Sequence, residues 1–71
     1  MPIAVERRVE ITVVASGLND SWSFWVTVPT YDNVSDKTVA SLARAKALAD
    51  LGFKGVAVSS LEVTYIEPLD D

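Results

Sequence analysis

The sequence predicts an α+β domain in which a three-stranded antiparallel sheet packs one helix against one of its faces. Two observations carry this prediction. Segments in both halves of the chain alternate apolar and polar residues, which is the period of a half-buried strand. Between them lies an alanine-rich segment with the composition of a helix. The 71-residue length allows one domain, which we expect to span residues 1–71.

The first strand is expected over residues 3–16. Val9 and Ile11 alternate there with more polar residues, so one face of the strand is apolar. Residues 16–21 are a cluster of turn-forming types that includes Gly17, a residue that adopts positive φ angles without steric cost. The pattern predicts a hairpin that leads into a second strand.

The second strand is expected over residues 22–28. Trp22 and Phe24 share one face of this strand, whereas Trp25 lies on the other. Pro29 has no backbone N–H to donate to a neighbouring strand, so it ends this strand or places its end at the edge of a sheet.

The helix is expected over residues 38–51. Ser35 or Asp32 is suited to cap its first turn, because a short polar side chain accepts a hydrogen bond from a free backbone N–H there. Gly52 is expected to end the helix, with Phe53 as the apolar contact that accompanies such an ending.

One face of this helix is expected to cover the sheet. Leu42, Ala45 and Ala49 share a face and Leu48 flanks it. The small alanine side chains would let the helix lie close to the strands.

The last strand is expected over residues 56–67. Its alternation shifts by one position at Ser59 and Ser60, which is typical of a β-bulge. Pro68 ends the strand, and residues 68–71 are expected to form a mobile acidic tail.

The strand lengths favour the spatial order 2-1-3 with all neighbours antiparallel. The two long strands are each other's best partners, and a strand that ends in proline suits an edge. The alternative order, 1-2-3, would place the second and third strands parallel through a right-handed crossover.

This arrangement divides the strand residues between two faces. The face expected under the helix contains Val9, Ile11, Val13, Trp22, Phe24, Val26, Leu61, Val63 and Tyr65. The other face, which one helix cannot also cover, contains Glu10, Thr12, Val14, Ser23, Trp25, Thr27, Glu62, Thr64 and Ile66.

The composition argues against catalysis. The chain has no His and no Cys, which removes the commonest general base and the commonest ligands of transition metals. No phosphate-binding loop, nucleophile motif or calcium-loop spacing is present in the sequence. We therefore expect no catalytic residue, no metal and no cofactor.

Trp25 is the residue best suited to contact a partner, because a large aromatic on an uncovered sheet face is costly to leave in water. The sequence predicts a protein-interaction or assembly module, in the simplest case a homodimer joined through the open sheet face or through edge strands. A partly exposed tryptophan packed on its threonine neighbours is the plainer interpretation. The residues expected to form the contact are Trp25, Val14, Ile66, Thr12, Thr27 and Thr64.

A small nucleic-acid-binding domain that stacks bases on Trp25 is the alternative. The net charge of −4 opposes it, and Glu10 and Glu62 are expected beside Trp25, where they would repel phosphates. No apolar run reaches the length of a membrane span, and the first residues lack the pattern of a signal peptide. We therefore expect a cytoplasmic protein that binds no membrane.

Overall fold

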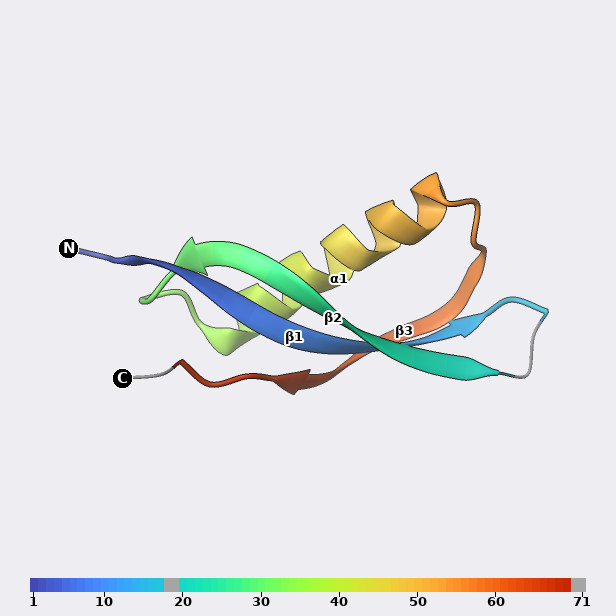
Figure 1. The fold of residues 1–71 in the computed structure, drawn as a ribbon, viewed down its shortest axis with the longest axis horizontal. Coiled ribbons are helices and arrows are strands. Elements are labelled where there is room, and N and C mark those ends of the chain that lie inside the picture. The colour runs from blue at the N-terminus through green and yellow to red at the C-terminus, as the bar shows by residue number, and fades with distance from the viewer. Residues whose placement is uncertain (18–19, 70–71) are drawn as a thin grey trace.

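The computed structural model describes residues 1–17 and 20–69. Within them the chain forms the strands β1 (Ala4–Ala15) and β2 (Ser21–Tyr31), the helix α1 (Asp36–Phe53) and the strand β3 (Val58–Ile66). The strands pair antiparallel in the order β2-β1-β3, and α1 lies across one side of the sheet (Figure 1). The predicted α+β fold and the favoured strand order are confirmed.

Two sequence predictions fall partly beyond the described residues. Residues 18 and 19 of the expected turn lie outside them, as do residues 70 and 71 of the expected acidic tail. The prediction of a mobile tail over residues 68–71 therefore stays a prediction.

β1 and β2 form a long hairpin whose apolar positions face each other. Val9 lies opposite Val26, and Ile11 lies opposite Phe24. β2 continues through Pro29 to Tyr31 instead of ending at residue 28. This extension is compatible with proline because β2 is an edge strand, where one side of the backbone has no neighbouring strand.

The core lies between α1 and the helix-facing side of the sheet. Its largest fully buried side chains are those of Ile11, Val9, Val13 and Val39. Burying apolar side chains of this size contributes roughly 1.5–3 kcal/mol each. The buried helix residues are Val39, Ala43, Ala47 and Leu51.

The prediction for the buried face of α1 is wrong. Leu42 and Leu48, which were expected to cover or flank the sheet, are exposed. The buried stripe instead begins at Val39 and ends at Leu51, with alanines between them. Alanines lie both on the buried stripe, at Ala43 and Ala47, and on the predicted one, at Ala45 and Ala49. The larger apolar residues at the two ends of the helix therefore decide which face is buried.

The N-terminus of α1 has the predicted serine cap. Ser35 has an extended conformation, with φ −68° and ψ 155°. Its Oγ accepts a hydrogen bond from the backbone N–H of Thr38 at 3.3 Å.

The C-terminus of α1 lies further along the chain than the sequence predicts. The helix continues through Gly52 to Phe53, and the residue with a left-handed conformation is Gly55, at φ 79°. The Gly55 N–H donates to the Gly52 carbonyl oxygen at 3.1 Å, and the Val56 N–H donates to the Leu51 carbonyl oxygen at 2.9 Å. This pair of bonds is the Schellman motif.

Burial explains why Gly55, and not Gly52, is the glycine of the capping motif. The Schellman motif brings Val56 against Leu51, and both residues belong to the core or pack on it. An ending at Gly52 would bring Phe53 against Leu48, whose side chain is exposed. Phe53 is itself 92% exposed, so the predicted contact of Phe53 is wrong.

β3 contains two irregularities, each with one extra residue opposite β1. The register shifts between Val14 and Ala15 and again between Glu10 and Ile11. The first shift leaves Ser59 as the extra residue, where the sequence predicts a bulge. The second leaves Thr64 as the extra residue, which the sequence did not predict.

The second bulge exchanges the predicted faces of two residues. Tyr65 lies opposite Glu10, on the face away from the helix, whereas Ile66 lies opposite Val9 and packs against the core. A bulge places two consecutive residues against one partner, so every later side chain changes face. The prediction that Tyr65 is core and Ile66 is on the open face is therefore wrong.

Trp22 also departs from the sequence prediction. It lies opposite Val13 on the helix side of the sheet, as expected, but its side chain is 37% exposed. It lies near the end of α1, beside Leu51 and Lys54. The helix therefore does not bury it.

Candidate functional site

The sheet face away from α1 is called here the open face. Its central row crosses all three strands, because Trp25 of β2 lies opposite Glu10 of β1, which lies opposite Tyr65 of β3. Trp25 is 43% exposed and Tyr65 is 50% exposed. The open face therefore presents two large aromatic side chains that the fold leaves half in water.

The two aromatic rings are held by each other and by an arginine. The ring centroids of Trp25 and Tyr65 are 6.1 Å apart, with an interplanar angle of 88°. The Arg8 guanidinium carbon lies 4.7 Å from the Trp25 ring centroid. Edge-to-face aromatic pairs and exposed cation–π contacts each contribute on the order of 0.5–1 kcal/mol. We call Arg8, Trp25 and Tyr65 the aromatic cluster.

Carboxylates beside the aromatic cluster have local partners. Glu67 Oε2 lies 3.3 Å from Arg8 Nη1, and Glu10 Oε1 accepts a hydrogen bond from the Thr64 hydroxyl at 3.0 Å. Both Arg8 and Glu67 are substantially exposed, so the ion pair itself adds little stability. Its effect is to leave this part of the open face with charges of both signs.

Hydroxyl groups cover the open face next to the aromatic cluster. The Thr12 and Ser23 hydroxyls are 2.8 Å apart, and Thr12 donates to Thr64 at 3.4 Å. Thr64 also approaches the Glu10 backbone carbonyl oxygen at 3.2 Å. The Thr64 hydroxyl thus provides a hydrogen-bond partner for the Glu10 carbonyl oxygen beside the bulge, where the regular ladder of hydrogen bonds is interrupted.

The structure brings together most of the residues that the sequence selected for the contact. The predicted residues on the open face are Trp25, Val14, Thr12, Thr27 and Thr64. Ile66 is not among them, because it packs against the core.

Three residues of this surface, Arg8, Tyr65 and Glu67, are not among those predicted from the sequence. Arg8 lies two residues before Glu10 in the same strand, so alternation places both side chains on the same face and could have identified Arg8. Tyr65 and Glu67 follow the unpredicted bulge at Thr64, so the alternation alone assigns Tyr65 to the wrong face.

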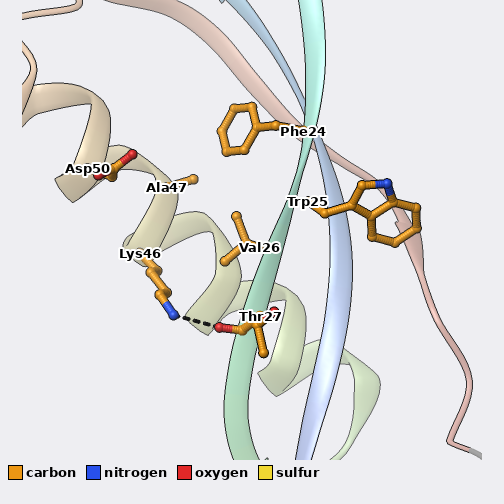
Figure 2. A pocket seen from close by; sticks show the side chains of 7 residues that line it. All are labelled: Phe24, Trp25, Val26, Thr27, Lys46, Ala47 and Asp50. Atoms are coloured by element: carbon orange, nitrogen blue, oxygen red, sulfur yellow. Dashed lines mark hydrogen bonds between the residues drawn. The ribbon is translucent and has the colours of Figure 1, made fainter.

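A groove lies on the helix side of the sheet, between α1 and the outer edge of β2. One part has a volume of about 500 Å³. Figure 2 shows Phe24 and Val26 directed toward the helix at Ala47, while Trp25 points to the opposite side of the strand. The Lys46 Nζ crosses the groove and donates to the Thr27 backbone carbonyl oxygen at 2.6 Å.

The groove continues toward the end of the helix. This second part has a volume of about 400 Å³, and its lining residues are Trp22, Phe24, Trp25, Asp50, Leu51 and Lys54. Asp50 and Lys54 form an ion pair at 3.1 Å on its rim. The floor of the groove is therefore largely aromatic and aliphatic, and its rim is charged.

Over residues 1–17 and 20–69, no helix has both the length and the apolar character required to cross a membrane. Comparison with known protein families, with curated proteins and with solved structures found no match to this chain.

Proposed function

We propose that this chain is a non-enzymatic protein-interaction module, and that the open face around Trp25 binds a protein surface, in the simplest case that of a second copy. The aromatic cluster carries this proposal. Two aromatic rings and an arginine lie together, half exposed, on a sheet face that α1 does not cover. Trp, Tyr and Arg are the residues most enriched among those that dominate protein–protein binding energy.

The surroundings of the cluster suit a protein partner. Hydroxyl groups of Thr12 and Ser23 border the aromatic rings, which matches the arrangement of a polar rim around an apolar centre. Arg8 and Glu67 supply both signs of charge, so two copies related by a two-fold axis have opposite charges available for contact.

The first prediction concerns Trp25→Asp. Placing a carboxylate at the centre of the contact would bury an unpaired charge, so we expect a folded protein whose assembly mass is lower than that of the wild type. Sedimentation velocity measures the mass, and circular dichroism checks the fold. The control is Phe53→Asp, the same kind of change at an exposed aromatic at the end of α1, outside the open face. An identical mass for wild type and Trp25→Asp contradicts the proposed contact.

A nucleic-acid-binding domain is the second candidate function. The stacking of Arg8 on Trp25 favours it, because exposed aromatics next to arginine bind unpaired bases. Glu67 already pairs with Arg8, and Glu10 lies opposite Trp25, so phosphates would meet negative charge. Salt-sensitive quenching of tryptophan fluorescence by an oligonucleotide would support this candidate over the protein contact.

A further inference from the structure

We propose that the outer edges of β2 from two copies of the chain pair antiparallel across a two-fold axis at Ser23, so that the two sheets become one continuous sheet. This contact uses backbone groups at the strand edge instead of the side chains of the open face. It goes beyond the proposed function, and it stands or falls independently of the open-face contact.

The structure identifies which backbone groups of β2 face outward. The Asp32 N–H donates to the Ile3 carbonyl oxygen at 2.9 Å, which places even-numbered positions of this strand toward β1. The Thr27 carbonyl oxygen accepts from Lys46 on the opposite side, which places odd-numbered positions outward. In an antiparallel ladder, the N–H and C=O of one residue point the same way. Ser21 and Ser23 therefore direct both groups away from β1.

Only one half of β2 has the protection that edge strands usually carry. Natural proteins block such edges with lysine or other charges, with proline or with bulges. β2 contains no charged residue between Ser21 and Tyr31, and its protection is confined to one half. Pro29 blocks one outward position, and Lys46 occupies the carbonyl oxygen of Thr27. The half from Ser21 to Trp25 has neither form of protection.

The unprotected half determines the register of the pair. With the two-fold axis at Ser23, each Ser23 lies opposite the Ser23 of the second copy, and Ser21 lies opposite Trp25. All of these are outward positions, so the facing backbones can exchange hydrogen bonds along the whole stretch. This register leaves the bond between Lys46 and Thr27 intact, because Thr27 lies beyond the paired residues.

The same register places aromatic side chains together on the helix side of the sheet. Trp22 of one copy lies opposite Phe24 of the other, in positions where the facing backbones are closest and side chains contact best. Phe24 is partly buried and Trp22 is 37% exposed. Both line the part of the groove with a volume of about 400 Å³. Pairing thus covers the aromatic residues that α1 leaves uncovered.

The charges on the rim of the groove are complementary in this arrangement. α1 runs antiparallel to β2, because Lys46 lies beside Thr27 and Lys54 lies beside Trp22. Asp50 lies between them along the helix, level with Phe24 and Trp25. A two-fold axis at Ser23 therefore places Asp50 of one copy on the same level as Lys54 of the other. Opposite charges across a contact favour the correct pairing.

The test removes one outward N–H and keeps the backbone hydrogen bonds to β1; the contact of the Ser23 hydroxyl with Thr12 is lost equally in the variant and in its control. Ser23→Pro deletes a donor that points away from β1, in a strand that already contains Pro29 at an equivalent outward position. In a Tyr65→Asp background, which places a charge on the open face at β3 and leaves the edge of β2 unchanged, we expect a dimer in sedimentation velocity. Adding Ser23→Pro should convert this dimer to a monomer. The matched control, Ser23→Ala, keeps the N–H and should keep the dimer.

A second measurement leaves the residues of the aromatic cluster unchanged. It detects the edge pairing by forming a crosslink, not by removing a contact. The chain has no Cys, so a single-cysteine variant can form a disulfide only with another copy. Ser23→Cys should oxidise readily to a covalent dimer, because facing residues about 5.5 Å apart meet the geometry of a disulfide. Thr27→Cys is the control. The proposed register separates the two Thr27 positions by on the order of 25 Å, so it should not crosslink.

The outcomes separate this inference from the proposed function. A Tyr65→Asp protein that is monomeric, or a dimer that survives Ser23→Pro, overturns the edge pairing and leaves the open-face contact standing. A mass unchanged by Trp25→Asp but lowered by Ser23→Pro overturns the open-face contact and supports the edge pairing. Equal crosslinking of Ser23→Cys and Thr27→Cys also overturns the proposed register.

Discussion

Arg7 is an ionisable side chain that the fold buries on the helix side of the sheet. Its side chain is 5% exposed. Arg7 Nη2 donates to Asp36 Oδ1 at 2.9 Å and to the Glu67 carbonyl oxygen at 3.3 Å, while its Nε has no hydrogen-bond partner within the described residues. Arg7 therefore joins β1 to the first turn of α1 and to the residue that follows β3.

A pair of substitutions separates the charge of Arg7 from its volume. Asp36→Ala leaves the buried guanidinium without its anionic partner, so we expect a loss of about 1–3 kcal/mol in the free energy of unfolding. Arg7→Met replaces the charge with an apolar chain of similar length and should cost far less, because apolar replacements of buried ions are often neutral. Urea denaturation measures both. A larger loss for Arg7→Met than for Asp36→Ala would show that Arg7 contributes mainly through its packing.

Alternation of apolar and polar residues predicts one part of the contact surface and not the other. Trp25 follows Phe24 directly in a regular strand, so the two side chains are predicted on opposite faces of the sheet. The structure places them on opposite faces. The faces of Tyr65 and Ile66 depend on a bulge whose extra residue, Thr64, is a common strand former. Its hydroxyl bonds to Glu10, a long-range contact that no local pattern contains.

At the scale of elements, the two glycines near the end of α1 have opposite roles. Gly52 lies inside the helix, whereas Gly55 has φ 79° and forms the capping motif. Beyond the adjacent residues and the backbone of the helix itself, neither has an atom within 4 Å of the place a Cβ would occupy. Backbone conformation alone therefore separates them.

Alanine substitutions at these glycines should change stability in opposite directions. Gly52→Ala should raise the free energy of unfolding by about 0.5–1 kcal/mol, because alanine is the better helix former. Gly55→Ala should lower it by about 1–2 kcal/mol, because a side chain strains the left-handed conformation. Thermal or urea denaturation measures both variants. Stabilisation by Gly55→Ala would contradict the position of the helix end.

The elements themselves were predictable to different degrees. The strand order follows from Pro29 and from the lengths of the other two strands, because backbone chemistry decides which strand tolerates an unpaired side. The buried face of α1 was not predictable in the same way. Its alanines provide two stripes of similar hydrophobicity, and only contact with the sheet selects the stripe that includes Val39 and Leu51.

At the scale of the whole molecule, the core is small and there are two candidate contact surfaces. The stability of the fold is therefore expected to depend on association. Chains of this length bury a modest share of their surface, and this one has no Cys with which to form disulfides. Partners that bind only the folded chain stabilise it by mass action. Association would therefore supply part of the stability that the core of a single copy lacks.

This coupling predicts that the melting temperature depends on protein concentration. We expect the wild-type melting temperature to rise as concentration increases, and the Trp25→Asp, Ser23→Pro double variant to show no such rise. Circular dichroism over a hundredfold range of concentration measures it. A wild-type melting temperature that is constant across this range would contradict self-association of the folded chain.

The two bulges of β3 have a consequence for how large an assembly can become. A flat, regular edge can recruit further strands without limit, which is the geometry of a fibril. The extra residues at Ser59 and Thr64 interrupt the regular spacing of β3, and bulges increase local twist. A sheet joined at β2 would therefore end at each β3 in an edge poorly suited to growth, so strand addition would stop at two copies instead of continuing into a fibril.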